Sequence, residues 1–255
     1  MRRHEGKVAL CAGSATGMGA MTARRLAKEG AKVVVADINA AGAQGLVDSI
    51  VADGGEGHAL GFDITEEDSV RETIERVVAE YGRLDLMHVN ATDRERNLED
   101  KDCVTTDLAV FDRMHKVSLR GHLLCSRFAI PEMLKTGGGA IVYTSSGASK
   151  GSAPMRMSYY IAKAGLNGLM RHVADRWGRE GIRANCVCPG VILTDAILIN
   201  TSEAERAAML KSTPSTRHGS EEDVASLVSF LLSDEEAGWI NGQAVNLNGG
   251  GLMAV

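Results

Sequence analysis

A tyrosine and a lysine stand four residues apart in the segment Tyr159-Tyr160-Ile161-Ala162-Lys163. At this spacing two side chains of a helix lie on the same face. A phenol has a pKa of about 10 and exchanges protons poorly at neutral pH unless a nearby positive charge stabilises its phenolate. The ammonium of Lys163 is placed to supply that charge. By itself this spacing is weak evidence for catalysis, because a tyrosine and a lysine four residues apart on a helix are more often an amphipathic surface pair.

A serine is predicted to face the same site. Ser146 follows a predicted strand at Ala140–Thr144, thirteen residues before Tyr159. Ligands collect beyond the carboxyl ends of strands in open α/β sheets. The combination of Ser146, Tyr159 and Lys163 therefore indicates an acid–base site at this edge of the sheet.

A glycine-rich turn follows the first apolar run and has the spacing GxxxGxG. Its residues are Gly13, Ser14, Ala15, Thr16, Gly17, Met18 and Gly19. Glycines in such a turn allow a tight bend, a close approach of backbone to a pyrophosphate, and close helix–strand packing. The N-terminus of the following helix offers free N–H groups to that anion. We interpret the turn as a dinucleotide site, although glycine-rich turns between strand and helix are common.

An acidic residue at the end of the second predicted strand strengthens this interpretation. Asp37 lies eighteen residues beyond Gly19. A carboxylate there would accept hydrogen bonds from the adenosine ribose and would repel a 2′-phosphate. The sequence therefore favours NAD over NADP as the cofactor.

The elements that must position these residues alternate along the chain. Strands are predicted at Val8–Ala12, Lys32–Ala36, His58–Phe62, Leu84–Val89, Ala140–Thr144, Ala184–Cys188 and Gln243–Leu247. Helices are predicted at Ala20–Glu29, Glu66–Tyr81, about Leu108–Leu134, Met157–Glu180 and Asp223–Leu232. Buried strands separated by helices indicate a parallel sheet covered on both faces. The predicted fold is α/β: one Rossmann-type, doubly wound parallel sheet of about seven strands, in a single domain over residues 1–255.

Composition excludes several classes of protein. The chain has 255 residues, 28 of them basic and 33 acidic, which gives a net charge of −5, and aromatic residues make up only 4%. Neither a basic groove nor a stacking platform for nucleic acid is expected, and no apolar run reaches the roughly 18–20 residues of a membrane helix. Five dispersed cysteines indicate a reduced, cytoplasmic protein. Cys186 and Cys188 share a strand face without further ligands, so no metal site is expected.

Taken together, these motifs resemble the short-chain dehydrogenase/reductase family, in its compact single-domain branch. The resemblance covers essentially the whole chain. Its further matches are Asp63-Ile64, Asn90-Ala91, the segment Asn185–Thr194 and the segment from Ile240 to Gly250.

The resemblance implies an activity and a role for each site residue. A hydride would pass between the nicotinamide and a secondary alcohol or ketone. Tyr159 would be the general acid–base, Lys163 would lower its pKa and hold the nicotinamide ribose, and Ser146 would position the substrate. Further implied cofactor contacts are Asp63 and Ile64 at the adenine, Asn90 along the ribose, and Ile192 and Thr194 at the carboxamide.

The resemblance also implies a homotetramer. Its subunits would pair through the helices predicted at about Leu108–Leu134 and Met157–Glu180. The apolar C-terminal segment Leu252-Met253-Ala254-Val255 would add to the contact.

The sequence departs from the family pattern at several positions. Ala12 and Val89 replace a threonine and an asparagine on strands that we expect to be neighbours, so we expect a local apolar patch. Thr92 stands for a glycine, and Asn248 for an aspartate. Ser118 replaces an asparagine of the catalytic tetrad. That asparagine is taken to act through its backbone carbonyl, so we expect Ser118 to support catalysis.

Two other functions stay open at the level of sequence. One is a ketoacyl-carrier reductase that uses NADPH, and the other is a catalytically silent dinucleotide-binding scaffold. An apolar substrate pocket is expected from Ala148, Met155, Met157, Ile197, Leu198 and Ile199. Arg94 and Arg96 lie in the charged run 93–102, interpreted as a solvated loop, and are candidates to contact an anionic substrate.

Overall fold

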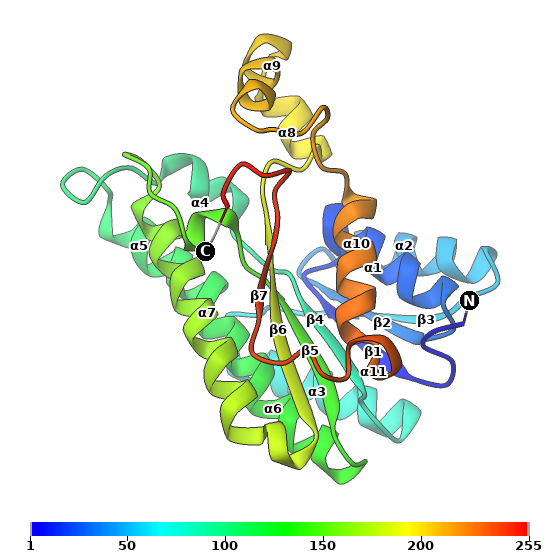
Figure 1. Ribbon diagram of the computed structural model, residues 1–255. Coiled ribbons are helices and arrows are strands. Elements are labelled where there is room, and N and C mark those ends of the chain that lie inside the picture. The colour runs from blue at the N-terminus through cyan, green and yellow to red at the C-terminus, as the bar shows by residue number, and fades with distance from the viewer. Residues whose placement is uncertain (1, 254–255) are drawn as a thin grey trace.

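Seven parallel strands form one sheet in the computed structural model, which describes residues 2–253 (Figure 1). Their order is β3-β2-β1-β4-β5-β6-β7, so the winding reverses between β1 and β4, where open α/β sheets bind ligands. The strands are β1 (Val8–Ala12), β2 (Lys32–Asp37), β3 (Glu56–Gly61), β4 (Leu86–Val89), β5 (Gly139–Thr144), β6 (Ile182–Pro189) and β7 (Ala244–Leu247). The predicted fold class is confirmed. Ala254 and Val255 of the predicted C-terminal contact lie outside the described residues.

Helices cover both faces of the sheet (Figure 1). One face carries α1 (Gly17–Lys28), α2 (Ala40–Ala52) and α10 (Glu221–Leu232), and the other carries α3 (Glu67–Tyr81), α6 (Gly121–Lys135) and α7 (Met157–Trp177). Shorter helices are α4 (Arg94–Glu99), α5 (Leu108–His115), α8 (Asp195–Asn200), α9 (Glu203–Lys211) and α11 (Asp234–Ala237). None of the described helices is long and apolar enough to cross a membrane.

Several predicted boundaries were wrong. Helix α2 was missed, since its sequence contains two glycines and only a few large apolar residues. The run 93–102 is not a solvated loop, because Asp93 caps α4 by accepting from the amide of Arg96. The single helix expected over about Leu108–Leu134 is divided by a π-helical turn at Lys116–Arg120. A π-helical turn contains one residue more than an α-helical turn, which leaves the apolar pattern of the sequence nearly unchanged. The periodicity therefore did not reveal the π-helical turn.

The expected apolar patch at the reversal point is present. Ala12 and Val89 are register partners on β1 and β4. Both side chains are fully buried in the same apolar cluster, together with Leu10 and Tyr143. The two departures from the family pattern therefore occur side by side and form one apolar contact.

His88 is a core residue. It lies inside β4, is fully buried, and its Nε2 is 2.8 Å from Oγ1 of Thr144 on the adjacent strand β5. Burial disfavours the charged imidazolium and lowers the pKa of His88 to about 3. The ring is therefore neutral at physiological pH.

This buried histidine predicts a loss of stability in acid. His88 has a pKa of about 3 in the folded chain against a model value of 6.5, so the unfolded chain binds more protons between these values and the free energy of unfolding falls as pH falls. From pH 7 to pH 5 this group contributes a loss of about 2 kcal/mol. Urea unfolding at several pH values measures the free energy of unfolding as a function of pH. Its slope between pH 7 and pH 5 should be shallower for His88→Asn than for the wild type. His172→Asn, at an exposed position of α7, is the matched control, and an unchanged slope in His88→Asn would contradict the prediction.

Candidate active site

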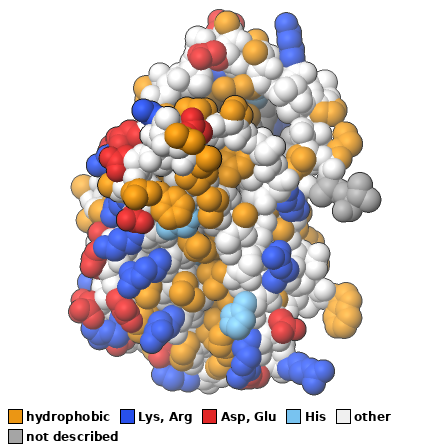
Figure 2. Space-filling view, turned by 90° about the vertical axis from the view of Figure 1, so that its left-hand side faces the viewer, with side chains coloured by type: hydrophobic (Ala, Val, Ile, Leu, Met, Phe, Trp, Pro, Cys, Tyr) orange, Lys and Arg blue, Asp and Glu red, His pale blue; other side chains and the backbone are white. Residues whose placement is uncertain are grey.

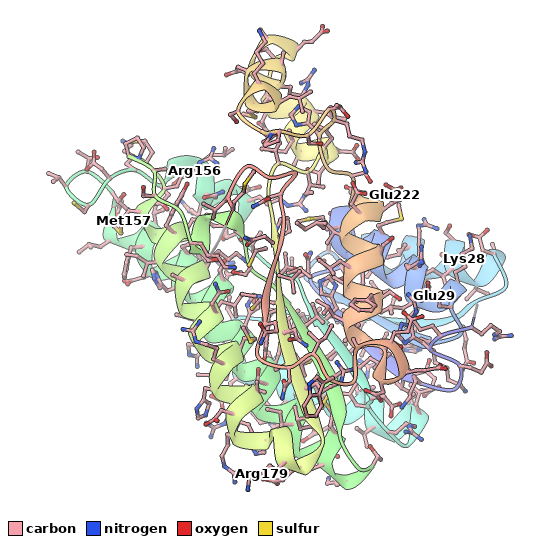
Figure 3. The ribbon with its side chains drawn as sticks, in the orientation of Figure 1. Lys28, Glu29, Arg156, Met157, Arg179 and Glu222 are labelled. Carbon is pink, nitrogen blue, oxygen red and sulfur yellow. The ribbon has the colours of Figure 1, made fainter. Side chains whose placement is uncertain are left out.

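The start of α7 is fixed by a carboxylate from the loop after β4. Asp100 is buried and accepts from the backbone amide of Tyr159 at 2.9 Å and from the amide and hydroxyl of Ser158 at 3.3 and 2.8 Å. Among the described residues, Arg156 is the one non-glycine in the left-handed region, with φ of 66°, and it turns the chain into the helix. Figure 3 labels Arg156 and Met157 at this end of α7, the same end of the molecule at which Glu222 lies in the first turn of α10. The cap therefore holds Tyr159 at the ligand-binding edge of the sheet.

Lys163 reaches the end of β5 from one helical turn further along α7. Its side chain is buried and its Nζ donates to the backbone carbonyl of Thr144 at 2.8 Å. The same Nζ is 5.8 Å from the centroid of the Tyr159 ring. Burial lowers the pKa of Lys163 to about 8, because the charged form loses its hydration. A charged and a neutral lysine are thus close in free energy near neutral pH.

Tyr159 and Ser146 are brought together as predicted. Burial raises the pKa of Tyr159 above its ordinary value, while a hydrogen bond with Ser146 and the positive charge of Arg156 oppose that rise. Lys163, the expected source of a positive charge for this phenol, is not among the groups that oppose the rise. The reason is geometric, since the lysine donates to Thr144 and the phenol is desolvated. Ser146 is fixed by accepting from the amide of Ala148 at 3.1 Å.

The glycine turn forms a close-packed cradle between β1 and α1. Gly13 has φ of +73°, and a Cβ there would lie 2.5 Å from the Cα of Ala91. A Cβ at Gly19 would lie 2.5 Å from the hydroxyl oxygen of Ser14. These contacts leave no room for a side chain at either position, so the turn packs closely against Ala91 and the start of α1.

Asp37 faces this cradle from the end of β2. One carboxylate oxygen accepts from the amide of Ala15 and the other from the amide of Asn39, both at 2.9 Å. The neighbouring Ile38 has 70% of its side chain exposed. The carboxylate is therefore held beside the turn with an apolar side chain next to it, an arrangement that suits a ribose and an adenine.

Unpartnered polar atoms line the same edge of the sheet. Asn90 donates through Nδ2 to the carbonyl of Gly13 at 2.9 Å. Its Oδ1 and the hydroxyl of Ser14 are buried and have no hydrogen-bond partner among the described residues. Buried polar groups are usually satisfied. Orphans beside an open glycine cradle fit a polar ligand such as a dinucleotide.

The remaining predicted cofactor residues are placed around these. Asp63 accepts through Oδ1 from the amide and hydroxyl of Thr65 at 2.9 and 2.8 Å. Ile64 is buried against Gly121, where a Cβ would lie 2.6 Å from its side chain. On the far side of the reversal point, Thr194 caps α8 and Ile192 forms a backbone bridge with Gly219. The predicted residues thus lie at the carboxyl ends of β1 to β6 or just beyond them.

Two departures from the family pattern contact each other. Ser118 is fully buried in the π-helical turn Lys116–Arg120, and its hydroxyl is 3.1 Å from that of Thr92. Thr92 occupies the place of a glycine and Ser118 that of a larger asparagine, so the threonine side chain fills space beside the shorter serine. Such π-turns are frequent at functional sites.

Sequence reasoning missed Asp100 altogether. It was assigned to a solvated run, although it is one of the buried acids of the chain. No spacing rule links it to Ser158, which lies 58 residues further on. The expected pocket residues Met155, Leu198 and Ile199 are exposed beyond the same edge, whereas Arg96 is paired with Glu99 on its own helix.

Comparison with known proteins agrees with this geometry. The family model described as enoyl-(acyl carrier protein) reductase matches residues 12–251. A probable short-chain type dehydrogenase/reductase of Bradyrhizobium diazoefficiens is 38% identical over 100% of this chain and 90% of its own length. A 7α-hydroxysteroid dehydrogenase of Bacteroides fragilis is 34% identical over 98% of this chain and 96% of its own.

A solved structure has the same fold. It is a 7α-hydroxysteroid dehydrogenase in complex with NADH and 7-oxo glycochenodeoxycholic acid, 33% identical, with a TM-score of 0.93 over 99% of this chain and 97% of that one. The matches extend over the sheet, both helical layers and the site at their edge. The chain belongs to the short-chain dehydrogenase/reductase family of oxidoreductases.

Proposed function

We propose that this protein is an NAD-dependent dehydrogenase that interconverts a secondary alcohol and a ketone, with the whole chain as a single dinucleotide-binding domain. The observation that carries the proposal is the position of Lys163. Its amine is buried 5.8 Å from the Tyr159 ring centroid, at the edge of the sheet that also holds the glycine cradle. Bound NAD would supply the acceptor and donor of the hydride.

The side chains of this site divide the proton chemistry between them. Tyr159 takes the proton of the substrate hydroxyl in oxidation and returns it in reduction. Ser146 donates to the substrate oxygen and keeps it against the phenol. Lys163, when charged, stabilises the phenolate against the desolvation that otherwise raises its pKa. Ser118, buried in the π-helical turn at Lys116–Arg120, supports catalysis through its backbone carbonyl.

The cofactor residues are proposed from the cradle geometry. The turn residues Gly13, Ser14, Thr16, Gly17, Met18 and Gly19 surround the pyrophosphate at the N-terminus of α1, where the first N–H groups of the helix can bind it. Asp37 binds the adenosine ribose, and Asp63 and Ile64 lie at the adenine. Asn90, Tyr159 and Lys163 contact the nicotinamide ribose, and Ile192 and Thr194 the carboxamide. The NADH bound by the hydroxysteroid dehydrogenase of the same fold supports this assignment.

The substrate is proposed to be largely apolar. Met155 and Leu198 expose 45% and 47% of their side chains beside the site, and Ile199 exposes 81%. Two relatives that are 34% and 35% identical act on 7α-hydroxysteroids. Hydroxysteroids are therefore the first substrates to screen, followed by simple secondary alcohols. A ketoacyl-carrier reductase would instead prefer NADPH, and a silent scaffold would bind NADH and turn over nothing.

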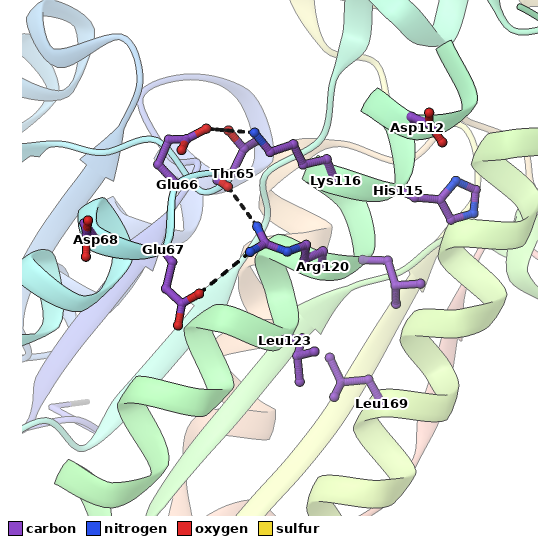
Figure 4. A pocket seen from close by; sticks show the side chains of 11 residues that line it. Thr65, Glu66, Glu67, Asp68, Asp112, His115, Lys116, Arg120, Leu123 and Leu169 are labelled. Carbon is purple, nitrogen blue, oxygen red and sulfur yellow. Dashed lines mark hydrogen bonds and ion pairs between the residues drawn. The ribbon is translucent and has the colours of Figure 1, made fainter. Parts of the chain in front are cut away.

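A homotetramer is proposed from an uncovered apolar groove. Leu119, Leu123 and Leu169 form its apolar floor, and the volume is about 1010 Å³ (Figure 4). Its rim is charged, with Lys116 paired to Glu66 at 2.8 Å and Arg120 to Glu67 at 3.8 Å. Figure 2 shows apolar side chains gathered down the face to which this helical layer belongs. A second copy of the chain would cover this surface.

The acid–base role predicts a specific loss in Tyr159→Phe. Removing the phenol oxygen should lower kcat roughly 10²–10⁴-fold, the usual contribution of general acid–base catalysis. NADH affinity, measured by nucleotide fluorescence, should stay near that of the wild type. Tyr160→Phe changes the adjacent half-buried ring and is the matched control, with near-normal turnover. A near-normal rate in Tyr159→Phe would eliminate this residue as the acid–base.

Asp37 predicts the choice of cofactor. The wild type should bind NAD more tightly than NADP, and Asp37→Ala should narrow that difference because the carboxylate no longer repels a 2′-phosphate. Calorimetric titration of both nucleotides measures it, and Asp53→Ala, an exposed acid after α2, should retain the wild-type preference. Tighter binding of NADP by the wild type would show that the role given to Asp37 is wrong.

The assembly prediction concerns the groove between α5, α6 and α7. Light scattering at micromolar concentration should give the mass of a tetramer. Leu123→Glu places a charge on the groove floor and should yield smaller species, because a charge cannot be buried unpaired in an apolar contact. Val51→Glu, at a similarly exposed position of α2, should leave the mass unchanged. A monomeric wild type would refute the assembly.

A further inference from the structure

An arginine from the loop after β4 lies over the glycine cradle. Gly17 has φ of +64°, and a Cβ there would lie 2.9 Å from Nη2 and 3.9 Å from Cζ of Arg94. Gly17 is the first residue of α1, whereas Arg94 begins α4 on the far side of the reversal point. The guanidinium thus stands directly against the backbone to which an anion at the α1 N-terminus would bind.

The guanidinium of Arg94 is free to bind a ligand. Among residues 2–253 it takes part in no side-chain hydrogen bond or ion pair shorter than 4 Å. Arg96, two residues further along α4 and also exposed, donates to the carboxylate of Glu99 at 2.6 Å. Arginine carries five N–H donors in a planar fork that matches two phosphate oxygens. Its position over Gly17 is therefore not explained by a contact within the protein.

A carboxylate lies beside the same position of Gly17, and its negative charge would oppose an anion there unless a cation balanced it. Glu221, the first residue of α10, places Oε1 3.6 Å from the same Cβ position. Burial and the negative charges of Asp195 and Glu222 raise the pKa of Glu221, while the positive charge of Arg94 lowers it. Without Arg94, a diphosphate in the cradle would meet an uncompensated negative charge.

We propose that Arg94 is a ligand of the cofactor diphosphate. Its guanidinium binds the phosphate oxygens beside Gly17, the first residue of α1, and neutralises Glu221 at the same time. The assignment rests on the proposed function, because it presupposes that the glycine turn holds a dinucleotide. From the sequence, Arg94 was a candidate to contact an anionic substrate. The present assignment makes the diphosphate of the cofactor its ligand instead.

The test compares ligands with and without the diphosphate. Calorimetric titration with ADP and with adenosine, together with NADH fluorescence, is made on the wild type, Arg94→Ala, Arg94→Lys and Arg96→Ala. Hydrogen bonds to charged groups contribute about 1.5–3 kcal/mol, so Arg94→Ala should lose roughly 10- to 100-fold in affinity for ADP and NADH. Its affinity for adenosine should be unchanged. Arg94→Lys should lose less, and Arg96→Ala, on the same helix, nothing.

A second variant tests the charge balance. Glu221→Gln removes the opposing carboxylate while keeping the length of the side chain, so it should bind ADP more tightly than the wild type and adenosine equally well. Weaker ADP binding in this variant would contradict the electrostatic part of the proposal. Thermal unfolding curves confirm that each variant is folded, as expected for an exposed arginine.

The outcomes separate this proposal from the proposed function. If Arg94→Ala keeps the wild-type ratio of ADP to adenosine affinity while the wild type binds NADH, Arg94 is not a diphosphate ligand and the dehydrogenase proposal stands. If Arg94→Ala changes only the KM of the substrate, the arginine contacts the substrate and the assignment is overturned. A wild type that binds neither ADP nor NADH would overturn both.

Discussion

The site depends on a buried lysine whose amine is held by the backbone of β5. The hydrogen bond from Lys163 to the carbonyl of Thr144 joins α7 to the end of this strand. On the opposite face the hydroxyl of Thr144 meets His88 of β4. Burying an ammonium costs free energy unless it finds a partner. The hydrogen bond to this carbonyl offsets part of the cost. The part that is not offset lowers the pKa of Lys163.

This constraint explains why α7 is fixed at both ends of its first turn. Asp100 binds the first amides of the helix, and Lys163 ties the next turn to the sheet. Tyr159 lies between these two anchors. The backbone that carries the Tyr159 ring is therefore fixed relative to the sheet, which suits the acid–base role proposed for this residue.

The reversal point of the sheet contributes the second half of the site. Asn90 at the end of β4 binds the carbonyl of Gly13 through its side chain and the carbonyl of Ala12 through its amide. The glycine turn is thereby attached to β4 as well as to β1. Arg94 follows four residues after Asn90. The segment after β4 therefore both holds the glycine turn and brings a positive charge next to Gly17. The positive charge of Arg94 and the N-terminus of α1 therefore meet at Gly17.

The sequence by itself determined the order of the strands, the glycine cradle, Asp37 and the group Ser146, Tyr159 and Lys163. These depend on local properties: apolar periodicity, turn glycines, and the spacing of two residues on one helix. The helix α2 was missed because its glycines weaken that local signal.

Only the tertiary structure decided which distant residues meet. Asp100 caps a helix that begins 57 residues later, Thr92 contacts Ser118, and Arg94 covers Gly17. The π-helical turn at Ser118 likewise appears only in the folded chain. The physical reason is common to all four. A charged or hydroxylated side chain in a loop has many possible partners, and the packing of helices against the sheet selects one of them.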